Sequence, residues 1–244
     1  MLRLRQMAIV AHDRDATVAA LQAAFGLGDG YDDPHIGQLG LHNAVLPVGD
    51  QFIEVVAPVS DGTTAGRYLA RRGGDAGYML IFQTDDHAAR SARVEALGVR
   101  VVARFDAPDF TNMQLHPADT GGAFFEIDQQ DDDGWSPAGT QWRDHVRTDV
   151  VDGIVGATIA CADPAAVAAR WADLLGLSEP ADGADGAATI ATDEATIHFV
   201  AEADPARQGI VAVALRATRG SAEAPAPAPA PAPTKIGGVE FTVR

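Results

Sequence analysis

The chain repeats one plan of secondary structure three times, and this repetition restricts its possible folds more than any other feature. Each repeat begins with an apolar strand, continues with a helix that follows an aspartate, and closes with two or three further strands. The first strands are LRLRQMAIVA at 2–11, GYMLIFQT at 77–84 and GIVGATIACA at 153–162. We therefore expect an α+β fold built from tandem βαβββ units.

The last part of the chain departs from this plan. QGIVAVALRAT (208–218) predicts a first strand and KIGGVEFTV (235–243) a last one, but alternating Ala-Pro stands where the other units have a helix. Proline cannot continue a helix interior, so we expect a stiff surface linker at 221–234. The predicted organisation is two paired units over 1–128 that carry the site, a linker at 129–149, and a degenerate second half over 150–244.

The linker at 129–149 has no clear periodicity but contains Trp135 and Trp142. We expect both tryptophans to hold the linker against the body of the protein, with the alternative that one of them covers a pocket.

Charge and composition exclude several classes of partner. With 18 Lys and Arg against 34 Asp and Glu, the formal charge is -16, which repels nucleic acid and anionic lipid. No apolar run approaches the roughly 20 residues that cross a bilayer, and the N-terminus does not resemble a secretory signal. The single cysteine, Cys161, cannot form an internal disulfide. These features predict a cytoplasmic monomer or homodimer whose partner is a small molecule.

A carboxylate ends a run that otherwise predicts the interior of a strand. In GGAFFEID (121–128), Glu126 follows two phenylalanines. A charge buried there is costly unless something pairs with it.

Three segments resemble the vicinal oxygen chelate superfamily, which includes glyoxalases, extradiol dioxygenases and bleomycin resistance proteins. They are LGVRVVARFD (97–106), LHPADTGGAFFEI (115–127) and GLHNAVLPVGDQFIEVVAP (40–58). The second, with its HP…TGG…E pattern, is especially similar to methylmalonyl-CoA epimerases, and the third is similar to glyoxalase-like domains. The resemblance implies that paired units curl into a U-shaped mixed sheet with helices on its convex side and a divalent metal on its concave face.

In this family the first and last strands of each unit supply the metal ligands. Carried over by motif, the four positions are Gln6, Glu54, Met79 and Glu126. The family usually has histidine where this chain has Gln6 and Met79. The resemblance therefore places Glu54 and Glu126 opposite each other across an apolar trough.

Two mechanisms suit such a pair of carboxylates. Gln6, Glu54 and Glu126 could hold a hard cation, Mg²⁺ or Mn²⁺ rather than Zn²⁺, which prefers nitrogen and sulfur ligands. Without metal, two close carboxylates repel, so one holds a proton and the other stays charged. Such an acid and base pair suits an isomerase, epimerase or lyase that acts on a small oxygenated carbon acid.

Two alternatives stay open at this point. One is a metal-free protein that only binds a small molecule, as the resistance proteins do, with both glutamates hydrogen-bonded to neighbouring groups. The other is a structural module whose trough is filled by apolar side chains.

The trough walls are predicted from strand alternation. Tyr78 is expected on the opposite face from Met79, beneath a helix. In the second half the equivalent positions carry no ligand set, which predicts a structural partner for the first half or a second, empty pocket. Besides Gln6 and Met79, the candidate substrate contacts are His42 or Asn43 from LHNAV and Asn112 and Gln114 from TNMQLHP.

Overall fold

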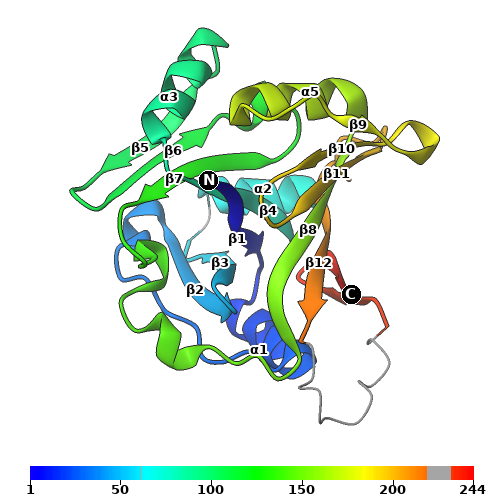
Figure 1. Cartoon of the computed structure of the whole chain (residues 1–244). Helices are drawn as coiled ribbons and strands as arrows, with labels where there is room; N and C mark the ends of the chain where they lie inside the picture. The colour runs from blue at the N-terminus through cyan, green and yellow to red at the C-terminus, as the bar shows by residue number, and fades with distance from the viewer. Residues whose placement is uncertain (61, 219–231) are drawn as a thin grey trace, which may run out of the picture.

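A computed structural model describes residues 1–60, 62–218 and 232–244, which form two mixed seven-stranded sheets (Figure 1). The order in the first sheet is β2-β3-β1-β4-β7-β6-β5 and in the second β13-β14-β12-β8-β11-β10-β9. The strands of the first sheet are β1 (Leu2–Val10), β2 (Leu41–Val48), β3 (Gln51–Pro58), β4 (Ala76–Thr84), β5 (Val101–Asp106), β6 (Phe110–Leu115) and β7 (Phe124–Gln130). Those of the second are β8 (Val151–Cys161), β9 (Ala181–Asp182), β10 (Ala188–Ala191), β11 (Thr196–Ala201), β12 (Gly209–Ala217), β13 (Thr234–Ile236) and β14 (Val239–Val243).

Both sheets follow the same topology, which confirms the predicted α+β fold of tandem units. The first strands of two units meet antiparallel at the centre, β1 against β4 and β8 against β12. The last strand of each unit pairs parallel with the first strand of its own unit. A parallel return of this kind needs a crossover connection, which a helix supplies in each of the first three units.

The helices begin and end where the sequence places caps. The side chain of Asp13 accepts a hydrogen bond from the Ala16 amide at the start of α1, and Gly26 ends the helix in the left-handed conformation. The helix α2 was not predicted; it lies between β3 and β4, with Thr63 as its N-cap and Gly73 after its last residue. The helices are α1 (Arg14–Phe25), α2 (Thr64–Arg72), α3 (His87–Ala96), α4 (Pro117–Thr120) and α5 (Pro164–Leu175), with short 3-10 turns at Ile36–Leu39, Ser136–Ala138, Trp142–His145 and Ala184–Gly186. Within the described ranges, no helix has the length and apolar character needed to cross a membrane.

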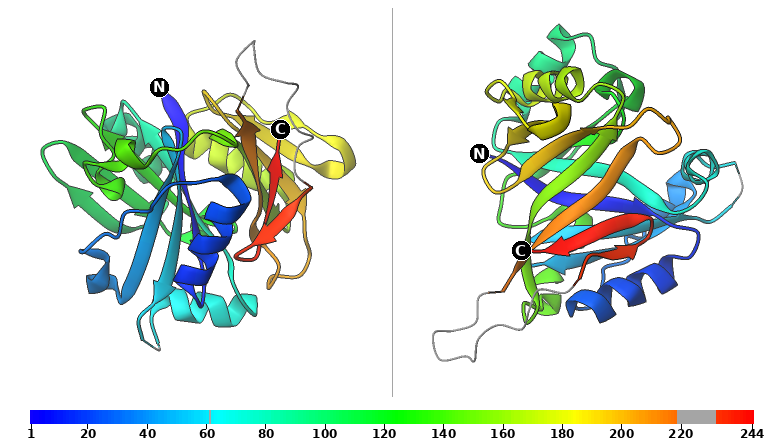
Figure 2. Two further views of the ribbon diagram at one scale, coloured as in Figure 1. Left: turned by 90° about the horizontal axis from the view of Figure 1, so that it is seen from below. Right: turned by 90° about the vertical axis from the view of Figure 1, so that its right-hand side faces the viewer.

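The second sheet packs against one face of the first (Figure 2). The side chains of the opposite, trough face form a separate apolar cluster. The indole of Trp171 on α5 stacks on Phe125 of β7 with ring centroids 4.6 Å apart and meets Phe199 of β11 edge-on at 5.4 Å. Its Nε1 also donates a 2.7 Å hydrogen bond to the carbonyl of Thr120. One continuous apolar core therefore joins the two halves.

The last segment of the fourth unit is a hairpin, whereas the sequence predicts a single strand. KIGGVEFTV is a hairpin of β13 and β14 rather than one strand, because Gly237 and Gly238 turn the chain with φ of 55° and 75°. A Cβ at Gly238 would lie 1.8 Å from the carbonyl oxygen of Asp75, so the turn also needs glycine for space. Residues 221–231 of the predicted linker lie outside the described residues, and Thr234 already belongs to β13.

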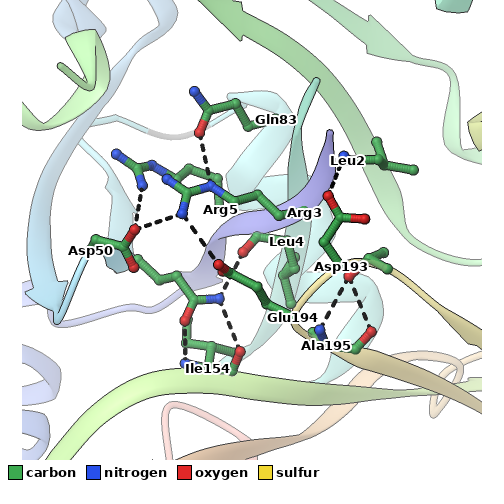
Figure 3. A network of polar contacts seen from close by, with 12 residues as sticks. Leu2, Arg3, Leu4, Arg5, Asp50, Gln83, Ile154, Asp193, Glu194 and Ala195 are labelled. Carbon is green, nitrogen blue, oxygen red and sulfur yellow. Dashed lines mark hydrogen bonds and ion pairs between the residues drawn. The ribbon is translucent and has the colours of Figure 1, made fainter. Parts of the chain in front are cut away.

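Polar groups fix the edge where the sheets meet (Figure 3). Arg3 of β1 pairs with Asp50 at 2.6 Å and with Glu194 of the second half at 3.6 Å. The buried amide of Gln51 donates to the carbonyl oxygens of Leu4 and Ile154, and it accepts from the Ile154 backbone amide at 2.6 Å. These bonds satisfy backbone groups that the contact between the sheets would otherwise leave unpaired.

Candidate active site

The four positions carried over from the family all lie buried on the concave side of the first sheet. The exposed fractions are 1% for Gln6, 8% for Glu54, 7% for Met79 and 5% for Glu126. The register places Glu54 opposite Ala8 of β1, Met79 opposite the same Ala8, and Glu126 opposite Ile81 of β4. The structure therefore gathers them on one face, although they come from four different strands.

Glu54 is held by two amides. Gln6 Nε2 donates to its Oε2 at 3.0 Å, and Asn43 Nδ2 donates to its Oε1 at 2.7 Å. Burial outweighs these two bonds and, together with the nearby charge of Glu126, raises the pKa of Glu54 to about 7. The carboxyl group of Glu54 therefore holds its proton well above the pH at which an ordinary glutamate loses it.

Glu126 has a freer environment. Its Oε1 lies 3.5 Å from Asn112 Nδ2, and Gln114 stands opposite it on β6. Its Oε2 is buried and has no hydrogen-bond partner among the described residues. Burial raises the pKa of Glu126. The unpartnered oxygen is available to a ligand or a proton.

Asp128 was not predicted as a site residue. It is fully buried two residues after Glu126, on the same face of β7, and neither of its oxygens accepts a hydrogen bond from a described group. Burial, and then the charge of Glu126, raise the pKa of Asp128 well above its usual range. The alternation in FFEIDQQ was the available signal, because residues two apart share a strand face.

The segment that follows β7 closes part of the trough. Trp135 is buried and its Nε1 donates a 2.7 Å hydrogen bond to Oε1 of Gln6. Its ring stacks on Phe52 at 6.2 Å, while Trp142 meets Phe52 edge-on at 5.1 Å and the guanidinium of Arg5 lies over all three rings. Both tryptophans therefore hold the linker to the body, and Trp135 also fills one end of the trough.

This arrangement decides how well a divalent metal fits. Gln6 would have to offer its oxygen as a ligand, but that oxygen accepts from Trp135 and the amide nitrogen faces Glu54. A flipped amide would place two N–H donors against each other at Trp135. Met79 offers a thioether, which hard cations do not bind. The described residues also contain no group of three or more His, Cys, Asp and Glu side chains placed to hold a metal. The predicted set of Gln6, Glu54 and Glu126 does not fit Mg²⁺ or Mn²⁺ here.

Aromatic side chains form the other end of the trough. Tyr78 meets Tyr68 of α2 at 5.2 Å and Phe124 of β7 at 4.8 Å. The alternation of β4 is broken by a bulge, so Tyr78 and Met79 lie in the same apolar cluster instead of on opposite faces. Tyr78 packs against Tyr68 of α2 on the same side of the sheet as Met79, so the prediction that it lies on the opposite face is wrong. Burial raises the pKa of Tyr78 to about 12, with Glu54 contributing, so its hydroxyl remains a donor.

Strand alternation separates His42 from Asn43. Asn43 faces the trough and binds Glu54, whereas His42 is exposed on the other face of β2. The prediction that His42 contacts substrate is therefore not supported by its position. Asn112 and Gln114 lie on the trough face beside Glu126 and are only partly buried, so solvent reaches the trough from the side of β6.

A cavity of about 180 Å³ lies at the outer end of the trough face, between β2 and the linker. Val45, the neighbour of Glu54 across the strand pair, contributes to its wall. The remaining wall includes Tyr31, Pro47, Ala138 and Trp142. This space could take the apolar part of a small ligand.

Comparisons with known proteins bear on both halves of the chain. A sequence model described as a glyoxalase-like domain matches residues 6–175. A hypothetical protein from Staphylococcus aureus aligns with 100% of this chain and 99% of its own, with a TM-score of 0.70 and 11% identity, which shows a shared fold. No curated protein matches the sequence.

Two methylmalonyl-CoA epimerases align with part of the chain. The protein from Streptomyces coelicolor, solved as a variant in complex with 2-nitronate-propionyl-CoA, is 25% identical over 52% of this chain and 94% of that chain, with a TM-score of 0.47. The protein from Mycobacterium tuberculosis is 22% identical over 52% of this chain and 87% of that chain, with a TM-score of 0.46.

Proposed function

The chain belongs to the glyoxalase-like domain family, and from this premise we propose that it moves a proton at a carbon next to a carbonyl group. The reaction class is isomerase or epimerase, and the substrate is a small carbon acid that enters the trough of the first sheet. A lyase would use the same first step. The observation that carries the proposal is the pair of buried carboxyl groups, Glu54 and Glu126, on the concave faces of separate units.

The pKa of Glu54 suits a general base. A base works best when its pKa lies near the working pH, and burial brings Glu54 to about 7. The two amides of Gln6 and Asn43 fix its orientation, so its carboxylate cannot rotate freely in the trough. In the proposed reaction Glu54 takes the proton from carbon, and the electron pair of the C–H bond moves toward the carbonyl oxygen.

Glu126 supplies the second proton transfer. It comes from β7, in the other unit, and its Oε2 has no partner among the described residues. A protonated Glu126 returns a proton to the opposite face of the carbon, which inverts the centre, and the roles reverse in the other direction. Asn112, Gln114 and the Tyr78 hydroxyl can donate to the oxygen on which negative charge develops.

We assign this chemistry to the side chains without a metal ion, because Trp135 and Glu54 occupy both ends of the Gln6 amide. Elemental analysis of protein purified without chelators tests the assignment. Stoichiometric Mg²⁺ or Mn²⁺ together with activity that chelators remove would contradict it.

Deuterium uptake tests the proposed reaction directly. The protein is incubated in D₂O with a panel of 2-substituted acids, hydroxy ketones and acyl thioesters, and carbon-bound deuterium is followed by NMR. Exchange in one class, reduced at least about 100-fold in Glu54→Gln and Glu126→Gln, supports the proposal. Glu95→Gln, an exposed glutamate on the outside of α3, is the matched control. Full exchange activity in both site variants would exclude the carboxylate mechanism.

The cavity beside Trp142 favours a second candidate, a protein that binds a small apolar molecule without turnover. Its wall combines apolar and aromatic side chains such as Val45 and Trp142 with polar ones such as Asp32 and Gln141, as in many ligand pockets. Tight binding by calorimetry, unchanged in Glu126→Gln and without deuterium uptake in any bound compound, would favour this function over catalysis.

A further inference from the structure

The strand β5 forms the free edge of the first sheet. It is the last strand in the sheet order, and Figure 1 shows it at the outer end, beneath α3. Val102 is 49% exposed and Phe105 56% exposed, and both count among the most exposed large apolar side chains in the described part of the chain. An uncovered edge strand with apolar side chains is a template for pairing with another strand.

The register of β5 and β6 determines which backbone groups of β5 are free. The Ala107 amide donates to the carbonyl of Phe110, so Ala107 turns its backbone groups toward β6. Backbone direction alternates along an antiparallel strand. Phe105 therefore also faces β6, and its amide reaches the Asn112 side chain. The backbone groups of Arg104 and Asp106 point outward, away from the sheet.

A second copy of β5 can satisfy these groups in an antiparallel pair. Hydrogen-bonded pairs across the new contact must join residues whose backbone groups point outward, which are Arg104 and Asp106. A register centred on Arg104 places two arginines opposite each other, and one centred on Asp106 places two aspartates opposite each other. Only the register centred on Phe105 pairs Arg104 with Asp106 of the second copy, twice.

The same register suits the side chains. Arg104 and Asp106 lie on the outer face of β5, because their partners Met113 and Thr111 face away from the trough. Neither forms an ion pair within the described residues. Arg104 Nη2 donates a 3.2 Å hydrogen bond to Oγ of Ser91 on α3, so pairing across the contact must compete with this one exposed bond. Phe105 would sit on the two-fold axis against its own copy, at the closely spaced type of antiparallel pair.

We propose that the protein forms a homodimer through antiparallel pairing of β5 with β5 of a second copy, centred on Phe105. The contact joins the first sheets of two copies edge to edge and leaves both troughs open on the same side. Because one strand from each copy buries less than a standard interface of about 1,200 to 2,000 Å², the dimer is weak, with a Kd on the order of 10 µM.

Charge reversal tests the contact and its register together. Sedimentation equilibrium of the full chain is measured from about 5 to about 500 µM, a range that brackets the expected Kd. Arg104→Asp and Asp106→Arg each place like charges opposite each other and should raise Kd at least about tenfold. The double variant restores the opposite-charge pairs and should return Kd to within about threefold of the original. Lys235→Asp, an exposed charge on the edge strand β13 of the other sheet, is the matched control.

Cross-linking gives a second measurement that does not depend on the charge variants. Phe105→Cys places identical cysteines on the two-fold axis, at a Cα spacing of about 4.5 Å that permits a disulfide. Mild oxidation should give a covalent dimer, whereas Val102→Cys should not, because Val102 faces no copy of itself in this register. Cys161 is buried and does not compete.

Three results would overturn the proposal: a monomer at about 500 µM, a dimer unaffected by either single reversal, or a double variant as dissociated as the singles. Circular dichroism and thermal unfolding should match the original protein, since both charged side chains are exposed.

Discussion

The indole Nε1 of Trp135 donates a hydrogen bond of 2.7 Å to Oε1 of Gln6, across 129 positions of the sequence. This contact orients the Gln6 amide so that its nitrogen faces Glu54. A residue of the linker thereby decides what a residue of the first strand can do in the trough: Gln6 donates to a carboxylate instead of offering an oxygen to a cation.

We expect Trp135→Phe to lower the free energy of unfolding by about 1–3 kcal/mol, because the buried oxygen of Gln6 loses its donor. Urea denaturation measures the change. Trp142→Phe is the matched control, since the Nε1 of Trp142 has no partner among the described residues. If both variants lose the same free energy of unfolding, the hydrogen bond to Gln6 contributes nothing beyond ring packing.

Glu126→Gln should reduce the rate of proton exchange about 10²- to 10⁴-fold, the usual contribution of a general acid or base. The amide keeps the size of the side chain, and its oxygen can still accept from Asn112, so ligand affinity should change little. Rate and affinity are measured by NMR exchange and calorimetry on the same protein. A loss of affinity that matches the loss of rate would place Glu126 in binding rather than in proton transfer.

Glu54 should make the protein less stable as pH rises. Its pKa is about 7 in the folded state against 4.5 when unperturbed, so the unfolded chain releases this proton first. The contribution of Glu54 to the free energy of unfolding is fully present below pH about 4.5. It is lost, by about 3 kcal/mol, as pH rises through about 7. Chemical denaturation from pH 4 to 8 measures the free energy of unfolding of both proteins. The value for Glu54→Gln should rise relative to that of the original protein as the pH increases. A constant difference between the two proteins would mean that Glu54 ionises normally.

Trp171→Ala should lower the free energy of unfolding by about 3–5 kcal/mol. The indole fills the core between the two sheets and donates a hydrogen bond to the Thr120 carbonyl. Calorimetric unfolding measures the change. Val102→Ala, at an exposed position, should alter stability by less than about 0.5 kcal/mol in the monomer. A small effect of Trp171→Ala would indicate that the halves do not depend on each other for stability.

Local patterns predicted much of the fold. Apolar strands, an aspartate cap and a glycine stop place α1 and α5, and the repetition of this plan fixes the order of the units. The turn at Gly237 and Gly238 was misread as part of one strand, because the residues around it continue the apolar pattern. The helix α2 carries the ordinary cap signals of Thr63 and Gly73, although it stands outside the repeated plan of the units.

The site was predicted only in part. Alternation and the family resemblance placed Glu54 and Glu126 on the trough face, where the structure has them. Alternation failed at Tyr78, because a β-bulge adds a residue to one strand and shifts the faces, and no local pattern reveals such a bulge.

The sequence by itself determined the order of strands and helices and the presence of acidic side chains in apolar strands, because periodicity and capping act over a few neighbouring residues. Tertiary structure decided what those acids touch. Gln6, Asn43 and Trp135 surround Glu54 only after distant segments pack together. The pKa of a buried carboxyl depends on such neighbours and on the water they exclude, and neither property belongs to any short stretch of chain.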